Sequence, residues 1–244
     1  MMFRTGGLLL SVVAGAALLT GCGEDEPPTP VEYGAARPAG DTLGLRPPGG
    51  SALPLAEWPD ACKLVTEAEL RAIVPQAKAL EHEPVKVTIM NFNPLAEAGP
   101  GTTGDVDRGG CTYDFHLPDH GDDEFTNSHF TVVVTAIADP VLVEKNYRED
   151  KEEDGTEKGY TDLAGSWGAE DCYLTAAAGT DEVTCLQGAY LFEVDGDTSA
   201  AGVVDMPDPG AKASENLAAA AERRKLWTEE VLAEVTRTVA ARLS

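Results

Sequence analysis

Hydrophobic and polar residues alternate in several short segments of the chain, a pattern typical of β-strands. The clearest segment is 129–138, in which Phe130, Val132, Val134 and Ala136 share one face. Comparable patterns predict strands over 85–92, 111–117, 171–177 and 182–194. The last two segments are separated by a short turn at 178–180, so they are expected to form a hairpin.

Three other segments carry helical signals. Thr66 and Glu69 fit a capping box in front of a short apolar stripe. Pro140 stands where a second helix can begin, and residues 213–243 read as helical, with Thr228 as a possible start of a further segment. The order of elements predicts an α+β fold, in which an antiparallel sheet is covered on one face by helices, including a long C-terminal helix.

The amino-terminal 21 residues have the pattern of a signal peptide. Arg4 precedes an apolar run over 8–19, and the next charge is Glu24. The uncharged stretch of 17 residues is at the lower limit for crossing a bilayer, and acidic residues follow it. A permanent transmembrane helix is therefore the weaker alternative, and residues 1–21 are expected to be removed.

The end of this segment, Leu19-Thr20-Gly21-Cys22, resembles the bacterial lipobox. The resemblance implies that Cys22 is lipidated and becomes the first residue of the mature protein. Two acyl chains on one residue give stable anchoring, whereas a single chain is marginal. We therefore expect a lipid-anchored protein on the extracytoplasmic face of the cell membrane.

Residues 22–57 differ in composition from the rest of the chain. Seven prolines and six glycines occur between residues 23 and 57. Such a segment buries too little apolar surface to offset its ordering entropy, which predicts a flexible linker in front of a domain over 58–244. The alternative is an ordered arm, docked through Leu43, Leu45, Leu53 and Leu55.

The charge of the chain narrows the range of partners. It has 42 acidic and 18 basic residues, which gives a net charge of −24. An anionic surface repels phosphate backbones, so nucleic acid is not expected as a partner.

Four cysteines remain once Cys22 is assigned to lipid, and an even number in an exported domain indicates two disulfides. Cys172 and Cys185 fall opposite each other in the expected hairpin, which leaves Cys62 to pair with Cys111. A zinc or redox site is the alternative. It is disfavoured because the sequence has no C-x-x-C motif and its cysteine spacings suit no zinc finger.

Short motifs of the domain resemble an actinobacterial cell-envelope lipoprotein family of unknown function. The segment 58–66, WPDACKLVT, is similar to the P-C-x-L-L-T opening of that family, with Val65 where leucine is usual. Gly110-Cys111-Thr112-Tyr113 resembles its second cysteine, and 188–194 with the following helix resembles its end. The resemblance implies a fold distantly like the extracellular sensor domains of mycobacterial receptor kinases, and it implies no catalytic residues.

A cluster of histidines and acids is the candidate for metal binding. It comprises His116, His120, Asp122, Asp123 and His129. Histidine nitrogens and carboxylates together suit zinc or another divalent ion, but residues 118–125 read as a loop without regular spacing. A surface hydrolase or divalent-metal-binding protein that uses this region is the alternative function.

Two further motifs fall short of a known site. Residues 150–155 imitate the start of a calcium loop, but Thr161 stands at position 12, where a bidentate glutamate is needed. Ser166 directly follows a glycine, so it does not fit G-x-S-x-G. We therefore expect no enzyme and no cofactor. The sequence favours a non-catalytic, sensor-type module that binds a ligand or an envelope protein.

Overall fold

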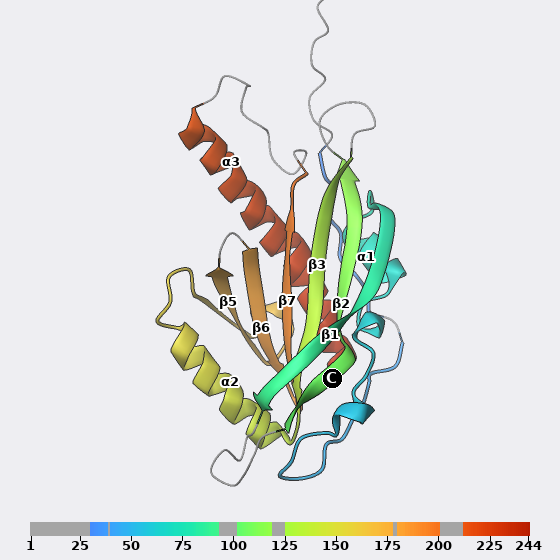
Figure 1. The fold of residues 1–244 in the computed structure, drawn as a ribbon. Coiled ribbons are helices and arrows are strands. Elements are labelled where there is room, and N and C mark those ends of the chain that lie inside the picture. Colours follow the sequence, from blue (N-terminus) through green and yellow to red (C-terminus); the bar gives the residue numbers. More distant parts are fainter. Residues whose placement is uncertain (1–29, 39, 93–101, 119–124, 178–179, 201–211) are drawn as a thin grey trace, which may run out of the picture.

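The computed structural model describes residues 30–38, 40–92, 102–118, 125–177, 180–200 and 212–244, and their main feature is one seven-stranded antiparallel sheet (Figure 1). The strand order is β1-β2-β3-β7-β6-β5-β4. The strands are β1 (Lys78–Phe92), β2 (Thr102–Pro118), β3 (Phe125–Ile137), β4 (Thr161–Ala164), β5 (Asp171–Ala177), β6 (Thr180–Gln187) and β7 (Tyr190–Thr198). The expected α+β class is therefore confirmed.

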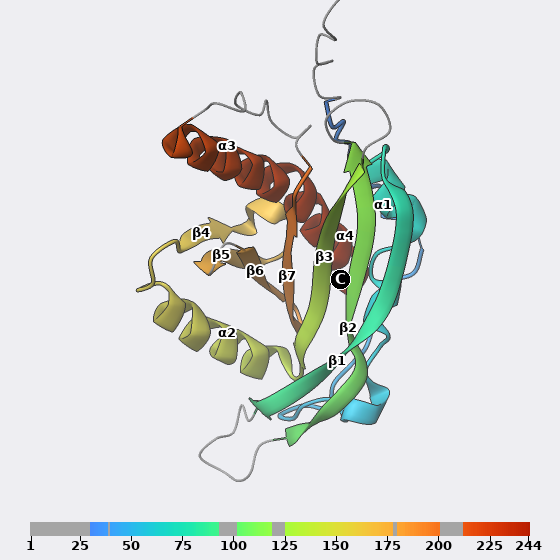
Figure 2. The ribbon, with the colours of Figure 1, turned by 45° about the horizontal axis from the view of Figure 1, so that its top comes forward.

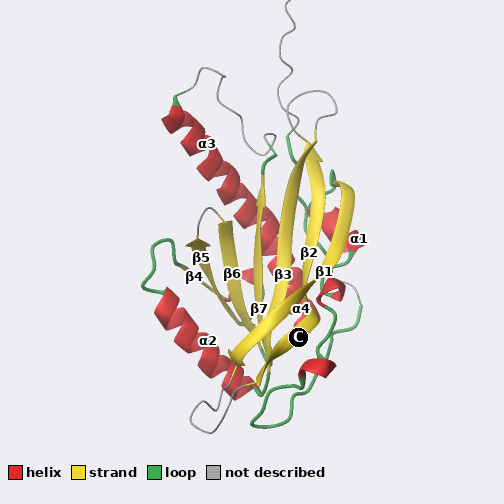
Figure 3. Ribbon diagram, viewed as in Figure 1, coloured by secondary structure: helices red, strands yellow, loops and turns green. Residues whose placement is uncertain are grey.

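The helices occupy the expected parts of the sequence. They are α1 (Glu67–Ile73), α2 (Pro140–Asp154), α3 (Ala213–Leu226) and α4 (Ala233–Leu243), with a π-helical segment, Trp227–Leu232, joining the last two. Both hydrogen bonds of the capping box of Thr66 and Glu69 are present. Thr228 does not start a new helix, because its hydroxyl donates to the carbonyl of Arg224 and the rod continues through it (Figure 3).

The main core lies between the sheet and the helices α1 and α4. Tyr113, Phe115 and Phe130 reach it from the strands, and Trp227 reaches it from the helical rod. The rings of Tyr113 and Phe130 stack with centroids 4.6 Å apart. The alternation read from 129–138 therefore marks the buried face of β3.

A second, smaller core lies on the opposite face of the sheet, under α2. Val143 and Tyr147 of α2 pack there with Tyr173, Leu191 and Ala136 of the strands. Figure 2 shows α2 and α3 on opposite sides of the strands β4, β5 and β6. The expectation of helices on one face thus describes the main layer only, since α2 covers part of the other face.

Several strands differ from the sequence prediction, and β1, β2 and β3 each begin earlier than the expected residues 85, 111 and 129. The segment 182–194 is divided into β6 and β7 by a tight turn, in which Gly188 has φ of 57°. The turn is not visible in the sequence, because β6 and β7 are buried on both faces of the sheet and their apolar residues form one continuous run. The edge strand β4 is not predicted at all, since its four residues are mostly exposed.

The described part of the expected linker is an ordered arm. Residues 30–57 lie along the domain, where Leu53 is 4% exposed and its N–H donates to the carbonyl of Ile137 at 2.8 Å. The N–H of Leu43 donates to the carbonyl of Arg242 at 2.9 Å. The linker interpretation is therefore corrected for these residues. Their composition is typical of a flexible segment, but a few leucines pack on the folded domain and hold the segment in place.

The structure contains two disulfides, Cys62–Cys111 and Cys172–Cys185, the expected pairs. Cys172 and Cys185 face each other in the register of β5 and β6. The signal segment and Cys22 lie outside the described residues. Among the helices that are described, none has the length and apolarity needed to cross a bilayer.

Candidate functional site

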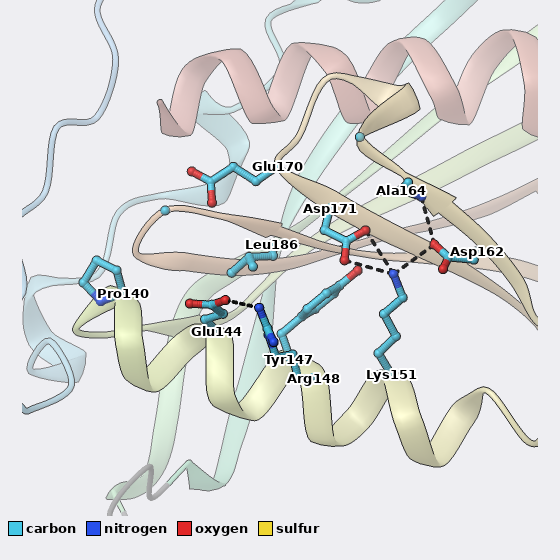
Figure 4. Close-up of a pocket in the computed structure, with 12 residues that line it drawn as sticks. Pro140, Glu144, Tyr147, Arg148, Lys151, Asp162, Ala164, Glu170, Asp171 and Leu186 are labelled. Carbon is cyan, nitrogen blue, oxygen red and sulfur yellow. Dashed lines mark hydrogen bonds and ion pairs between the residues drawn. The ribbon is translucent and has the colours of Figure 1, made fainter.

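A groove of about 800 Å³ runs between α2 and the end of the sheet formed by β4, β5 and β6 (Figure 4). One wall belongs to α2 and the other to β4, the turn after it and the start of β5. The lining residues used below are Glu144, Tyr147, Arg148, Lys151, Asp162, Glu170, Asp171 and Leu186.

The wall from α2 is set by helical spacing. The helix begins with Asp139 as N-cap, whose carboxylate accepts from the N–H of Val141, and with Pro140 at its first position. Residues 144, 147, 148 and 151 follow the i, i+3, i+4, i+7 spacing of one helical face, and their side chains line the groove.

The opposite wall is a short turn that is fixed on both sides. The N–H of Ala164, a residue with φ of 46°, donates to a carboxylate oxygen of Asp162 at 3.0 Å. Gly168, with φ of 86°, lies so close to α4 that an added Cβ would be 3.1 Å from the Cγ of Arg237. The Cys172–Cys185 disulfide then holds β5 to β6. Such a wall is rigid enough to present side chains in a fixed arrangement.

Lys151 joins the two walls at one end of the groove. Its ammonium donates to Asp162 at 2.9 Å and to both carboxylate oxygens of Asp171 at 2.9 and 3.0 Å. Burial alone would lower the pKa of Lys151, but the hydrogen bonds to Asp162 and Asp171 outweigh it and raise that pKa. The hydrogen bond from Lys151 lowers the pKa of Asp162. Lys151 and Asp162 are therefore both charged at neutral pH.

Tyr147 lines the groove with a hydroxyl that has no hydrogen-bond partner. The residue is 1% exposed, and Figure 4 shows its ring directed from α2 toward Asp171. Burial raises the pKa of the Tyr147 hydroxyl, and the charge of Asp171 raises it further, so the group stays protonated. The hydroxyl itself is closed off from solvent and has no partner among the described residues, so it costs the fold free energy.

The other end of the groove is lined by Glu144, Arg148 and Glu170. Arg148 donates to Glu144 on its own helix at 2.5 Å, which is a surface ion pair. Glu170 lies on the opposite wall (Figure 4), and its carboxylate has no ion pair within the described residues. The two ends therefore differ, because a basic residue crosses the groove at only one of them.

The candidate metal ligands are only partly described. His116 and His129 are half-buried on the neighbouring strands β2 and β3, and His129 pairs in register with Asp114. The Nδ1 of His129 lies 3.5 Å from a carboxylate oxygen of Asp197. His120, Asp122 and Asp123 lie outside the described residues. No cluster of three or more ligand side chains occurs in the part of the chain that the structure describes.

The resemblance of 150–155 to a calcium loop is misleading. Residues 140–154 form α2, so Asp150 and Asp154 lie one helical turn apart instead of wrapping around an ion. Asp150 accepts from Asn146 at 2.6 Å, and Asp154 accepts from the hydroxyl of Tyr173 at 2.8 Å. The acids are the charged end of a helix.

The sequence did not single out the groove residues. Lys151 stands inside a charged run, and Asp171 and Glu170 stand before a strand, where exposed acids are common. The one usable signal was the spacing of Tyr147 and Lys151, which puts them one turn apart on the same helix, and it does not specify a site. Comparison with known proteins finds no matching family model, no similar curated protein and no similar solved structure.

Proposed function

We propose that this chain is a non-catalytic binding module of the cell envelope, anchored by lipid on Cys22 at the extracytoplasmic face of the membrane, and that the groove beside α2 is its binding site. The lipobox-like sequence and the signal segment support the anchor. The two disulfides fit an exported domain, because such bonds persist in oxidising compartments.

The observation that carries the binding proposal is the groove itself, about 800 Å³ in volume and lined by charged side chains from both walls. Ligand sites in proteins are typically concavities of this size in which a few polar groups converge. A binding role is favoured over a catalytic one by the pairing of groove side chains with each other. Lys151 is held by two carboxylates, and the hydroxyl of Ser166 donates to the carbonyl of Leu163 at 2.6 Å.

The binding proposal is tested with the full chain in detergent and a library of small anionic, cationic and neutral solutes. Amide signals of Gly165 and Gly188, which line the groove, serve as reporters in heteronuclear NMR. We expect at least one class of solute to shift these two signals. If no class shifts them, the groove is not a binding site and the proposal fails.

The anchor is tested separately by cell fractionation. Cys22→Ser removes the only thiol that the lipobox resemblance offers for acylation, so the variant is expected to leave the membrane fraction. A variant that stays with the membrane as firmly as the native chain would contradict the anchor.

A further inference from the structure

The ordered arm is attached to the domain from its first described residues. The side chain of Gln76 donates through its Nε2 to the carbonyl of Pro30 at 3.1 Å and accepts through its Oε1 from the N–H of Glu32 at 2.8 Å. The N–H of Gly34 donates to the carbonyl of Ile73 at 2.8 Å. The chain is therefore fixed to the domain at residues 30–34, next to the end of α1.

The sequence permits this close attachment at Gly34. A Cβ added to Gly34 would lie 2.3 Å from the carbonyl oxygen of Ala72, so only glycine lets the arm approach α1 this closely. The neighbouring Tyr33 packs against the main core. The start of the arm is therefore a specific contact of the fold.

The attachment leaves a short tether to the proposed lipid anchor. Seven residues, 23–29, lie between Cys22 and Pro30. Whatever path they take, a chain of this length spans at most about 29 Å when it is fully extended. A linker that was free over all of 22–57 would let the domain turn in any direction. The attached arm instead keeps one point of the domain close to the bilayer.

This attachment point lies at one end of the sheet. A row of residues that pair from strand to strand crosses the sheet there, namely Lys78 on β1, His116 on β2, Asn127 and Ser128 on β3 and Thr198 on β7. Gln76 lies two residues before Lys78, so the start of the arm and this row share one end of the domain (Figure 1). We call it the arm end.

The groove lies toward the opposite end of the sheet. Leu186, which lines the groove, pairs with Leu191 near the start of β7. Leu191 and Thr198 are seven residues apart on this strand, which corresponds to about 23 Å. Pro140 and Gly188 also line the groove, and they lie beyond Leu191, further from the arm end (Figure 2).

Resting on the proposed lipid anchor at Cys22, we propose that the arm end of the domain faces the membrane and that the groove faces the aqueous side of the envelope. The opposite orientation would force the tether to run along the domain almost fully extended, at a large cost in conformational entropy. The ligand of the groove then arrives from the aqueous phase as a water-soluble molecule, and not as a lipid of the same membrane.

The test uses the full acylated chain in phosphatidylcholine nanodiscs that contain a few lipids with gadolinium-labelled head groups. The label speeds the relaxation of nearby amide protons, and the effect falls steeply with distance. Ser128 and Thr198 report on the arm end, and Gly188 reports on the groove. We expect the enhancement to be about tenfold or more larger at Ser128 and Thr198 than at Gly188, given the distances above.

Variants of the arm test the cause of the orientation. Gly34→Ala places a methyl group against the carbonyl of Ala72, and Gln76→Ala removes both contacts of that side chain. Each variant lengthens the free tether, so the ratio of enhancement between the two ends should fall about threefold or more. Gly49→Ala is the matched control on the same arm. Its Cβ would lie 3.9 Å from a carboxylate oxygen of Asp139, an ordinary contact, so the ratio should not change.

Three results would overturn the inference. Equal enhancement at Gly188 and Thr198 on a chain bound to the discs means that the domain turns freely, and it leaves the lipid anchor standing. A larger enhancement at Gly188 means that the groove faces the bilayer, and it also leaves the anchor standing. A chain that does not bind the discs contradicts the anchor itself, and the orientation with it.

Discussion

Tyr147 and Tyr173 lie against each other under α2, with ring centroids 5.6 Å apart, and only one of them has a partner for its hydroxyl. The hydroxyl of Tyr173 donates to Asp154 at 2.8 Å, which ties β5 to the end of α2. The hydroxyl of Tyr147 has no partner in the part of the chain that the structure describes. Of these two neighbouring buried tyrosines, one therefore stabilises the fold through its hydroxyl and the other does not.

Phenylalanine substitutions at these two positions should have different effects on stability. Tyr147→Phe removes a hydroxyl that pays a desolvation cost, so the free energy of unfolding should stay the same or rise by up to about 1 kcal/mol. Tyr173→Phe leaves Asp154 without its hydrogen-bond donor, so the free energy of unfolding should fall by about 1–2 kcal/mol. Urea denaturation of both variants measures the difference, and equal losses would show that Tyr147 also has a structural partner.

Replacing Lys151 should loosen α2 from the sheet. Lys151→Met leaves Asp171 without its cation, and we expect a loss of about 1–3 kcal/mol in the free energy of unfolding. Lys145→Met is the matched control, because Lys145 pairs only with Glu149 at 3.8 Å on the exposed face of the same helix. That control should lose under about 0.5 kcal/mol.

Hydrogen exchange locates the effect of Lys151→Met. Amides of α2 and β4 should exchange faster in this variant, while β2 and β3 stay protected. A uniform change over all strands would mean that the lysine stabilises the whole domain instead of the groove.

The acids under α2 should make stability depend on pH. The pKa of Glu193 is raised from 4.5 to about 7, first by burial and then by the nearby carboxylates of Glu182, Asp195, Asp150 and Asp154. The native state therefore holds a proton that the unfolded chain has already released. Between about pH 4.5 and 7 the free energy of unfolding should fall as the pH rises, because Glu193 must then ionise among like charges.

Glu193→Gln removes this cost. The variant should match the native chain near pH 4 and exceed its free energy of unfolding at pH 8 by roughly 1–3 kcal/mol. The remaining slope belongs to Asp150, Glu182 and Asp195, whose pKa values are also raised, first by burial. Denaturation curves at pH 4, 6 and 8 measure the free energy of unfolding of both proteins. A difference between the two proteins that stays the same at all three pH values would refute the role of Glu193.

The disulfides should be found by mass spectrometry of unreduced peptides as Cys62–Cys111 and Cys172–Cys185. Removing either pair as a double alanine variant should destabilise the domain, by about 3 kcal/mol for the shorter loop and about 4 kcal/mol for the longer. A peptide that joins Cys62 to Cys172 or to Cys185 would contradict both the pairing and the registers of β5 and β6.

Local signals in the sequence predicted much of the fold. The capping box at Thr66, the alternation over 129–138 and the spacing of Cys172 and Cys185 each depend on residues close together in the chain. Such signals agree with the final structure because the same contacts stabilise it. They also led to a linker over 22–57, which is wrong for residues 30–57, since docking depends on partners such as Ile137 and Arg242 far along the chain.

The groove could not be predicted in the same way. Its walls come from α2, from β4 and from the turn between β6 and β7, and neither β4 nor that turn has a clear local pattern. Lys151 reads as one charge among many in 148–154 until the fold brings Asp162 and Asp171 to it. The lack of a partner for Tyr147 is likewise a property of the packed structure and not of the sequence.

The most direct test of the binding role follows the amide signals of Gly165 and Gly188 in the native chain against the solute library. If the groove is a binding site, at least one class of solute should shift both signals with a saturable dependence on its concentration. Two signals that no class of solute shifts would contradict the account.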